Sequence, residues 1–388
     1  MSNLYLSAPS MVTPLGHEPE DIASALFAGR SGLVQKADLL LDGTLAWVGA
    51  VQSPLAPLPE AFSGLDCRNN RMLRQALDGL QAELEWAKAA YGRDRIAVVL
   101  GSSTAGIDVG ERALAQWQNT GALPAGFNYN VQTLGSVAQF ASDYLGVSGP
   151  AYTLSTACSS SGKAFASARR LMNSGLADAV VVGGVDSLCR LTVNGFSALE
   201  SVSATPCSPF SQDRQGINIG EGAAVFLLSR RHSPVSLAGV GESSDGYHIS
   251  APDPDGHGAR LAMQQAISAA GITAEAIDYV NLHGTGTVKN DEMEAKLMTR
   301  FFAHQPWVSS SKAQIGHCLG AAGALEAAFC YLALSRQTLL PQVSHKPYDS
   351  SLPALKFAKP GQAAPLRHVM SNSYAFGGSN VSVILSHE

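Results

Sequence analysis

The chain has 388 residues, 46% of them hydrophobic and only 15% charged, so it is long enough to bury a large core. Its net charge of -5 argues against nucleic acid as a main partner, and it shows neither a signal peptide nor an apolar run of about 18 residues, so we expect a cytoplasmic protein without membrane insertion. Six cysteines without any CxxC pair exclude a disulfide framework and indicate reduced thiols.

Helix and strand patterns alternate from one end of the chain to the other. Apolar residues at helical spacing predict helices at 19–29, 68–92 and 134–146, and after residue 158. Apolar runs rich in β-branched residues predict strands at 94–103, 178–187 and 222–230. The alternation then restarts, with strands expected at 235–245 and 276–284, helices at 258–271, 291–302 and 316–335, and two closing strands within 368–386.

This alternation predicts an α/β fold with mostly parallel strands. The two halves also resemble each other: TLSTACSSSGKAFASA and SSSKAQIGHCLGAAGALEA both run from small polar residues into a helix start crowded with Gly, Ala and Ser. Small residues at matching positions allow two helices to pack closely. We therefore expect a duplicated core with halves at 1–232 and 233–388, folded as one unit.

Cys158 stands where a strand gives way to a helix, in TLSTACSSSGKAFASARRLM. Two interpretations compete. Cysteine packs well as a small hydrophobe, so it could be an inert core residue. Alternatively, the positive end of the helix could stabilise a thiolate nucleophile, and the small residues after it would leave backbone N–H groups free to approach a carbonyl.

The second half supports the nucleophile interpretation. NLHGTGTVKND places His283 just beyond a strand, and SSSKAQIGHCLGAAG places Lys312 and His317 on a similar loop before a helix. Glycines and small residues flank both histidines, whereas the other histidines lack such flanks and are interpreted as surface or structural. The spacing of His283 and His317 matches no metal motif, so a zinc site is not expected.

Six motifs occur together and in order: TACSSS, GEGAAVFLL, SSDGYHISAPDPDG, HGTGT, SSSKAQIGHCLGAAG and SNSYAFGGSN. Over nearly its whole length the chain resembles the β-ketoacyl-acyl carrier protein synthases of the two-histidine elongating type, which are thiolase-like condensing enzymes. The resemblance implies a duplicated, five-layered α-β-α-β-α thiolase-like fold that forms dimers.

The resemblance also implies a mechanism. Cys158 takes an acyl chain from a carrier-protein thioester, with the backbone N–H groups of Cys158 and Phe376 as an oxyanion hole. A malonyl thioester then loses CO₂ while His283 and His317 hold its oxygen. The resulting enolate attacks the acyl group, and the chain grows by two carbons. No cofactor or metal is expected. The substrates are thioesters attached to the phosphopantetheine group of the acyl carrier protein.

Other residues match supporting positions of the family, and each also has a plainer interpretation. Lys312 would set charge near the site, with Glu326 as its partner in a buried ion pair. Thr285 and Thr287 match hydroxyls that hydrogen-bond the phosphopantetheine arm. Phe376 matches a gating residue, with Gly377 and Gly378 beside it allowing the loop to move, and Phe196 matches a residue that lines the acyl pocket. Turn chemistry would explain the threonines equally well, and core packing would explain Phe196.

One departure concerns specificity. Many fatty-acid elongating members carry an aromatic residue where PFSQDRQGINIGEG has Ile217. A smaller side chain there changes which acyl chains fit. Together with RNNRMLRQAL, this resembles the subgroup that serves bacterial aryl polyene pathways.

The expected partner is an acidic acyl carrier protein, which Arg68, Arg71 and Arg74 would contact. A solvated helix face would explain these arginines equally well. The dimer could be a homodimer, or a heterodimer with a chain-length-factor subunit. Four alternatives stay open: a housekeeping fatty-acid elongation synthase, a non-condensing chain-length-factor-type subunit, a degradative thiolase, and a cysteine hydrolase. The retained Cys158, His283, His317 and Lys312 argue against the second, and AFGGSN in place of a second cysteine argues against the third.

Overall fold

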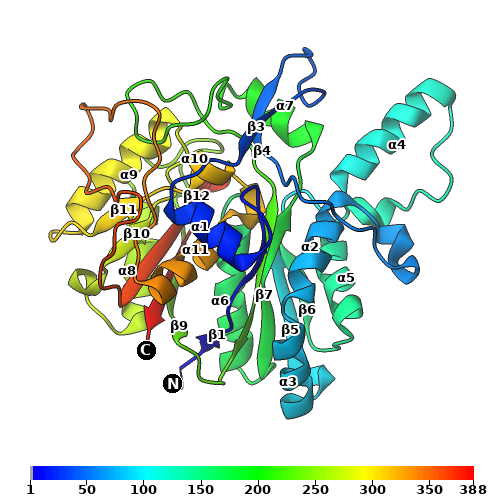
Figure 1. The fold of residues 1–388 in the computed structure, drawn as a ribbon, viewed down its shortest axis with the longest axis horizontal. Coiled ribbons are helices and arrows are strands. Elements are labelled where there is room, and N and C mark those ends of the chain that lie inside the picture. The colour runs from blue at the N-terminus through cyan, green and yellow to red at the C-terminus, as the bar shows by residue number, and fades with distance from the viewer. Residues whose placement is uncertain (1–2) are drawn as a thin grey trace.

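A computed structural model describes residues 3–388. Its main sheet has eleven strands, in the order β11-β10-β12-β13-β9-β1-β8-β7-β5-β6, with β2 paired to β8 (Figure 1). The strand bounds are β1 Tyr5–Leu6, β2 Ser10–Val12, β5 Ile96–Gly101, β6 Ala151–Leu154, β7 Ala179–Asp186, β8 Gly222–Ser229, β9 Val235–Ser244, β10 Tyr279–Asn281, β11 Trp307–Ser309, β12 His368–Ala375 and β13 Ser379–His387. A separate hairpin pairs β3 (Leu33–Lys36) with β4 (Ala46–Gly49).

The same strand arrangement occurs twice. In the first half β5 lies between β6 and β7 and is parallel to both, and β7 pairs antiparallel with β8. In the second half β10 lies between β11 and β12 in parallel, and β12 pairs antiparallel with β13. The short strand β1 pairs antiparallel with both β8 and β9 and so joins the two halves. Parallel strands end at a common edge of the sheet, so the segments that follow them emerge on the same side.

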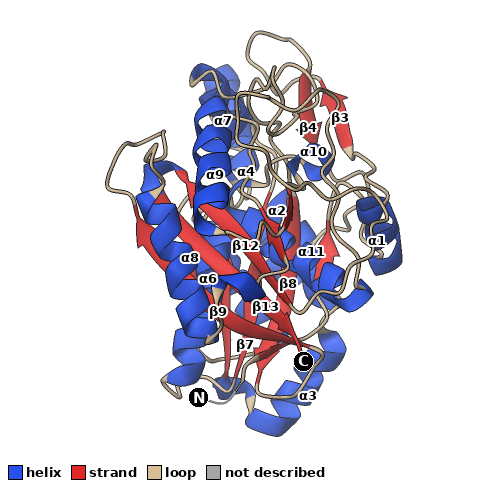
Figure 2. Cartoon of the chain, turned by 90° about the vertical axis from the view of Figure 1, so that its left-hand side faces the viewer, coloured by secondary structure: helices blue, strands red, loops and turns tan. Residues whose placement is uncertain are grey.

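The helices are α1 Pro19–Phe27, α2 Arg68–Asp78, α3 Gln81–Tyr91, α4 Ile107–Thr120, α5 Gly135–Leu145, α6 Ser160–Asn173, α7 Arg190–Ala198, α8 His257–Ala270, α9 Val288–Phe301, α10 Lys312–Ile315 and α11 Ala322–Arg336. Three hydrophobic clusters define the layers. One places α2, α3 and α5 against strands of the first half, and another places α8 and α9 against strands of the second (Figure 2). The third holds α6 and α11 between the two halves. The expected five-layered α/β fold is confirmed, but the expectation of mostly parallel strands is wrong. Only the pairs that β5 and β10 form are parallel within the described residues; the other pairs are antiparallel, because the strands at the seam between the halves, β8, β1, β9 and β13, all pair antiparallel.

Most predicted elements are present, with corrections at two helices. The region 68–92 is two helices, α2 and α3, separated at Gly79 and Leu80, and not one. The helix expected at 316–335 begins only at Ala322, because residues 316–321 form a loop and a short 3₁₀ turn at Leu319–Ala321. In both regions a continuous apolar periodicity conceals a local break in the backbone.

The two central helices approach closely where each carries a glycine. A Cβ atom added to Gly323 of α11 would lie 2.7 Å from the backbone nitrogen of Gly162 in α6 and 3.0 Å from its Cα. No real Cβ atom tolerates the first of these contacts without a shift of the backbone. The small residues noted at the two helix starts therefore set the distance between the middle-layer helices, as expected.

Helix α4 projects from the body together with the segment that follows it (Figure 1). Large apolar side chains are exposed on both: Leu114 and Trp117 on the helix, and Leu123 and Tyr129 in the segment after it. Strand β6 forms one end of the main sheet, and within residues 3–388 its one partner strand is β5. Among the described residues, no helix combines the length and the apolar character needed to cross a bilayer.

Candidate active site

Cys158 lies four residues beyond the end of β6 and two before the start of α6. The preceding Ala157 has a φ of 53°, a left-handed conformation that non-glycine residues rarely adopt and that marks strain at functional sites. This turn carries the thiol into a cavity, where its Sγ lies 2.9 Å from Nε2 of His317. The side chain is buried, but its sulfur contacts an imidazole, and a cysteine that only packs in the core has no need of such a partner.

The protonation state of Cys158 differs from the sequence-based expectation. Burial raises the pKa of the thiol to about 12, against the opposing effects of the Lys312 charge and of the backbone N–H groups of Phe376 and Cys158. The expectation of a resting thiolate is therefore wrong, because desolvation outweighs the helix start and the nearby charge. The sulfur is held as a thiol, and Nε2 of His317 is placed to exchange its proton.

His283 and His317 arrive from different elements of the second half. His283 follows β10, and His317 follows α10; their ring centroids are 5.5 Å apart, and the rings are nearly perpendicular. Burial lowers the pKa of both imidazoles well below the usual value, and the positive charge of Lys312 lowers it further. Both rings are therefore neutral, and each can present one N–H as a hydrogen-bond donor.

Cys158, His283 and His317 form one cluster. The thiol sulfur and one ring nitrogen from each histidine all lie within 4.8 Å of one another. A thioester bound in the cavity can thus meet the sulfur and both imidazoles at once. The resemblance implied that Cys158 faces both imidazoles, and the structure brings the three together from segments far apart in the chain and gives their separations.

Lys312 and Glu326 form the buried ion pair expected from the sequence. The Nζ of Lys312 lies 2.5 Å from Oε1 of Glu326, and each side chain is only 2% exposed. The same ammonium donates to the backbone carbonyl of His283. Lys312 thereby positions the His283 loop and supplies the charge that lowers the pKa of both imidazoles.

Glu294 of α9 holds the same loop from the other side. Its two carboxyl oxygens accept the backbone N–H groups of His283 (2.8 Å) and Gly284 (2.7 Å). Burial raises the pKa of Glu294 to about 8, and these two hydrogen bonds oppose that rise. Sequence analysis did not identify Glu294; an acidic residue on the buried face of an amphipathic helix was the available signal.

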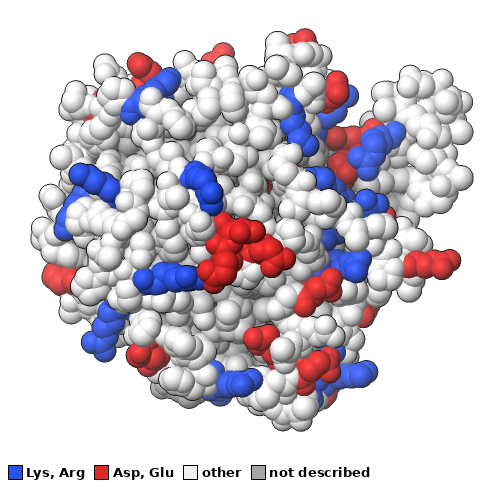
Figure 3. All heavy atoms as spheres, in the orientation of Figure 1, with Lys and Arg blue, Asp and Glu red and all other residues white. Residues whose placement is uncertain are grey.

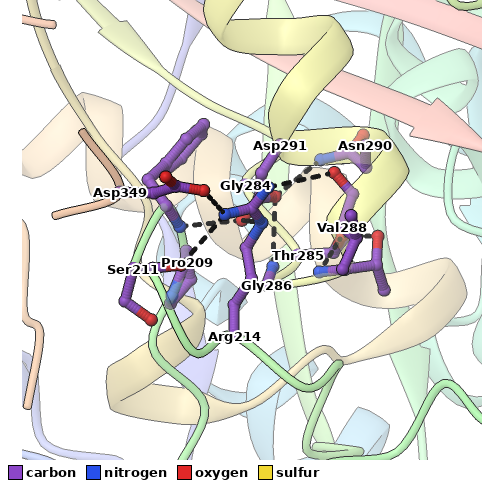
Figure 4. A network of polar contacts seen from close by, with 12 residues as sticks. Pro209, Ser211, Arg214, Gly284, Thr285, Gly286, Val288, Asn290, Asp291 and Asp349 are labelled. Atoms are coloured by element: carbon purple, nitrogen blue, oxygen red, sulfur yellow. Dashed lines mark hydrogen bonds and ion pairs between the residues drawn. The ribbon is translucent and has the colours of Figure 1, made fainter. Parts of the chain in front are cut away.

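A network around Arg214 and Asp291 holds the threonine turn (Figure 4). Asp291 accepts the backbone N–H groups of Phe210 at 2.7 Å and of Gly286 at 3.2 Å. Arg214, almost fully buried, pairs with Asp349 at 2.6 Å and lies 3.8 Å from Asp291. The network fixes the backbone between Thr285 and Thr287, whose hydroxyls lie 2.9 Å apart. Sequence analysis did not identify this network, because its members span 140 residues.

The cavity has a volume of about 300 Å³ and combines the reactive residues with an apolar wall. Phe196, Ile217 and Phe376 all line it, as do Thr285 and Thr287. The rings of Phe196 and Phe376 pack with centroids 5.6 Å apart. Gly377 and Gly378 have φ of 80° and 76°, a conformation that glycine adopts without strain, so they set the path of the chain after Phe376.

Comparison with known proteins identifies the family. The model of the β-ketoacyl synthase N-terminal domain matches residues 7–233, and that of the C-terminal domain matches residues 235–346. The chain belongs to the β-ketoacyl synthase family. This β-ketoacyl synthase is therefore a condensing enzyme of the acyltransferase class.

Several relatives and solved structures resemble the synthase. Nodulation protein E of Rhizobium meliloti is 34% identical over 299 residues, 74% of each chain. A 3-oxoacyl-[acyl-carrier-protein] synthase 2 of Staphylococcus aureus is 32% identical over 310 residues, 75% of this chain and 77% of that one. A chain in the structure of a ketosynthase (ApeO) in complex with its chain length factor (ApeC), from Xenorhabdus doucetiae, is 43% identical with a TM-score of 0.96, covering 100% of this chain and 98% of that one.

The three arginines proposed for carrier contact lie on α2, outside the cavity, and each has an acidic partner. Arg68 pairs with the buried Glu221 at 2.6 Å, Arg71 pairs with Asp66 at 2.5 Å, and Arg74 lies 3.5 Å from Asp78. On the face shown in Figure 3, basic side chains likewise stand among acidic ones. The first arginine has a structural role in the synthase, and contact of the three with a carrier stays a prediction.

Proposed function

We propose that this synthase extends an acyl chain held on Cys158 by two carbons, taking the unit from a malonyl group on an acyl carrier protein. The observation that carries the proposal is the cluster of Cys158 with two neutral imidazoles within 4.8 Å. Neutral histidines donate hydrogen bonds to a thioester oxygen without pairing with the malonyl carboxylate, which must leave as CO₂.

The first half-reaction transfers the acyl group. As Sγ of Cys158 attacks the incoming thioester, the thiol proton passes to Nε2 of His317 at 2.9 Å, and the phosphopantetheine thiol leaves with a proton. The backbone N–H groups of Phe376 and Cys158, which both lower the pKa of the Cys158 thiol, stabilise the oxyanion. Each such donor contributes roughly 10²–10³ in rate in comparable enzymes.

The second half-reaction forms the carbon–carbon bond. The malonyl thioester oxygen accepts hydrogen bonds from His283 and His317 while the carboxylate leaves as CO₂ and its bonding electrons form an enolate. The enolate carbon attacks the acyl carbonyl on Cys158, the tetrahedral oxyanion collapses, and the sulfur is expelled as a thiolate, which takes up one proton from solvent to restore the thiol. Lys312 and Glu294 are positioning residues here, because they hold the backbone of His283 and touch no substrate.

For the pathway we propose polyene extension, and for the partner a chain length factor. The support is the small Ile217 in the cavity wall, the 43% sequence identity to a chain of a ketosynthase–chain length factor complex, and the exposed apolar residues of α4 and of the segment that follows it. The alternative is fatty-acid elongation as a homodimer, favoured by the relatives named 3-oxoacyl-[acyl-carrier-protein] synthase 2. A non-condensing role is disfavoured by the intact cluster.

The test of the reaction is mass spectrometry of the protein after incubation with acyl carrier protein thioesters. The acyl mass should appear on the peptide that contains Cys158, and Cys158→Ala should abolish condensation while it leaves some malonyl decarboxylation. Acylation of any other residue would overturn the assignment.

The pathway is tested with a panel of saturated and polyunsaturated acyl carriers, with and without a chain length factor. Extension of conjugated chains only with that subunit supports the heterodimeric polyene synthase. Efficient extension of saturated chains by the protein alone, as a homodimer in sedimentation analysis, supports fatty-acid elongation instead.

A further inference from the structure

The thiol and imidazoles of the active site also form a set of metal donors. Sγ of Cys158 and one ring nitrogen each of His283 and His317 lie within 4.8 Å of one another. One thiolate and two imidazoles are ligands that zinc prefers, and three protein ligands with an open fourth position are typical of accessible zinc sites. The spacing of the two histidines in the sequence gave no indication of this set, since the third donor comes from the other half.

The geometry requires only small shifts to hold an ion. Zn–S and Zn–N bonds of about 2.3 and 2.0–2.1 Å place tetrahedral donors roughly 3.4–3.6 Å apart. The Sγ–Nε2 separation of 2.9 Å between Cys158 and His317 must therefore open, and because all donor atoms lie within 4.8 Å of one another, no other separation has to close by more than about 1.4 Å. Nδ1 of neither histidine has a hydrogen-bond partner among the described residues, so no such bond resists a small ring rotation.

The surroundings suit a reversibly bound ion. The cavity beside the cluster leaves room for water or another ligand at the fourth position. Lys312, which lies behind the His283 loop, is paired with Glu326, and this limits its repulsion of a second positive charge.

We infer that Cys158, His283 and His317 bind one zinc-like divalent cation in place of substrate, which gives a reversibly inhibited state. On binding, the thiol releases its proton to solvent, and a sulfur lone pair forms the metal–sulfur bond without any change of oxidation state. Binding follows from the cluster alone; only its inhibitory consequence rests on the proposed function, because a metal-bound sulfur cannot attack a thioester.

A second donor cluster on the surface is the main competitor. Asp253, Asp255 and His257 also bring three donor atoms within 4.8 Å, but His257 and Asp255 are exposed. Asp253 already accepts the backbone N–H groups of Asp255 and His257 and contacts Nδ1 of the His257 ring. This cluster lacks sulfur, so a spectroscopic signature of thiolate ligation distinguishes the two sites.

The experiment uses Co²⁺ as a spectroscopic probe on chelator-treated full-length protein. We expect one Co²⁺ per chain with a thiolate-to-metal charge-transfer band, and displacement of that band by Zn²⁺. Cys158→Ala should abolish the band, and His283→Ala should weaken binding. Cys189→Ala, which removes a buried thiol outside the cavity, and His257→Ala should both leave the band unchanged. A band that persists in Cys158→Ala, or that is lost in His257→Ala, overturns the inference.

A second measurement needs no variant and so does not depend on how the variants fold. Zn²⁺ at 100 times its dissociation constant should slow alkylation of Cys158 about 100-fold, because only the free fraction reacts, and a chelator should restore the rate. Mass spectrometry locates the alkylated residue. Unchanged alkylation at saturating Zn²⁺ refutes the site, whether or not the protein condenses acyl groups.

Discussion

The ion pair between Lys312 and Glu326 predicts an unusually large loss of stability when one partner is removed. The ammonium and carboxylate are 2.5 Å apart, and each side chain is 2% exposed. Oε2 of Glu326 has no partner among the described residues, so the carboxylate depends on Lys312. Lys312→Met keeps the length of the side chain but leaves that carboxylate buried without a partner for its charge.

The expected cost of Lys312→Met is about 3–5 kcal/mol, the range for leaving one member of a buried pair without compensation. Glu326→Gln should cost less by itself, because the amide oxygen can still accept from Lys312. In the double variant Lys312→Met/Glu326→Gln no charge is left unpaired, so its cost should fall clearly below the sum of the two single costs.

The chain offers a matched control on its surface. Lys296 and Glu292 are also 2.5 Å apart, but their side chains are 40% and 47% exposed. Lys296→Met should therefore cost no more than about 1 kcal/mol. Both variants are compared by urea unfolding followed by circular dichroism at pH 7.5, with equal slopes as the check on two-state behaviour.

A cost for Lys312→Met that equals that of Lys296→Met would refute the reasoning, because burial is the main difference between the two pairs. Additive single and double costs would likewise show that the two charges are not coupled. Such a result would also weaken the argument that Lys312 lowers the pKa of the active-site imidazoles.

Four further outcomes are expected. His283→Ala or His317→Ala should permit acyl transfer to Cys158 but block malonyl decarboxylation, measured as acyl-enzyme mass and CO₂ release. The unfolding free energy of the native protein should fall on acidification from pH 7.5 to 5.5, because the buried His317 imidazole stays neutral while the unfolded one takes up a proton below about pH 6.5. The variant His317→Gln lacks this titration, so its unfolding free energy should fall by about 1.4 kcal/mol less over the same pH range. Ile217→Phe should shift product formation toward shorter acyl chains in the carrier panel. Gly323→Ala should cost roughly 1–3 kcal/mol in urea unfolding, because its methyl group meets the backbone of α6.

Each of these outcomes has a clear contrary result. Normal CO₂ release by either histidine variant would remove that residue from the mechanism. The sign of the pH effect is fixed: a lowered folded pKa gives stability that is present above the unfolded value and is lost as the pH falls, so a larger acid loss in His317→Gln would contradict it. An unchanged product range for Ile217→Phe would show that the acyl chain runs elsewhere, and an unchanged urea midpoint for Gly323→Ala would show that the central helices can separate without cost.

The sequence by itself determined the fold class and brought out three candidate reactive residues. Alternating strand and helix periodicities reflect which faces of each segment are buried, and that is a local property. Cys158, His283 and His317 could be recognised because each lies at the end of a strand or the start of a helix among small residues, a context that a buried packing residue does not need.

Only the tertiary structure decided the distances, protonation states and supporting contacts. The cluster of Cys158 with both imidazoles joins segments from the two halves, so no spacing along the chain could reveal it. The thiol was expected to be ionised, but burial raises its pKa to about 12, and the extent of burial is known only when the surrounding layers are in place. Glu294 and Asp291 were missed for the same reason: the backbone N–H groups that they accept belong to turns that packing alone brings to them.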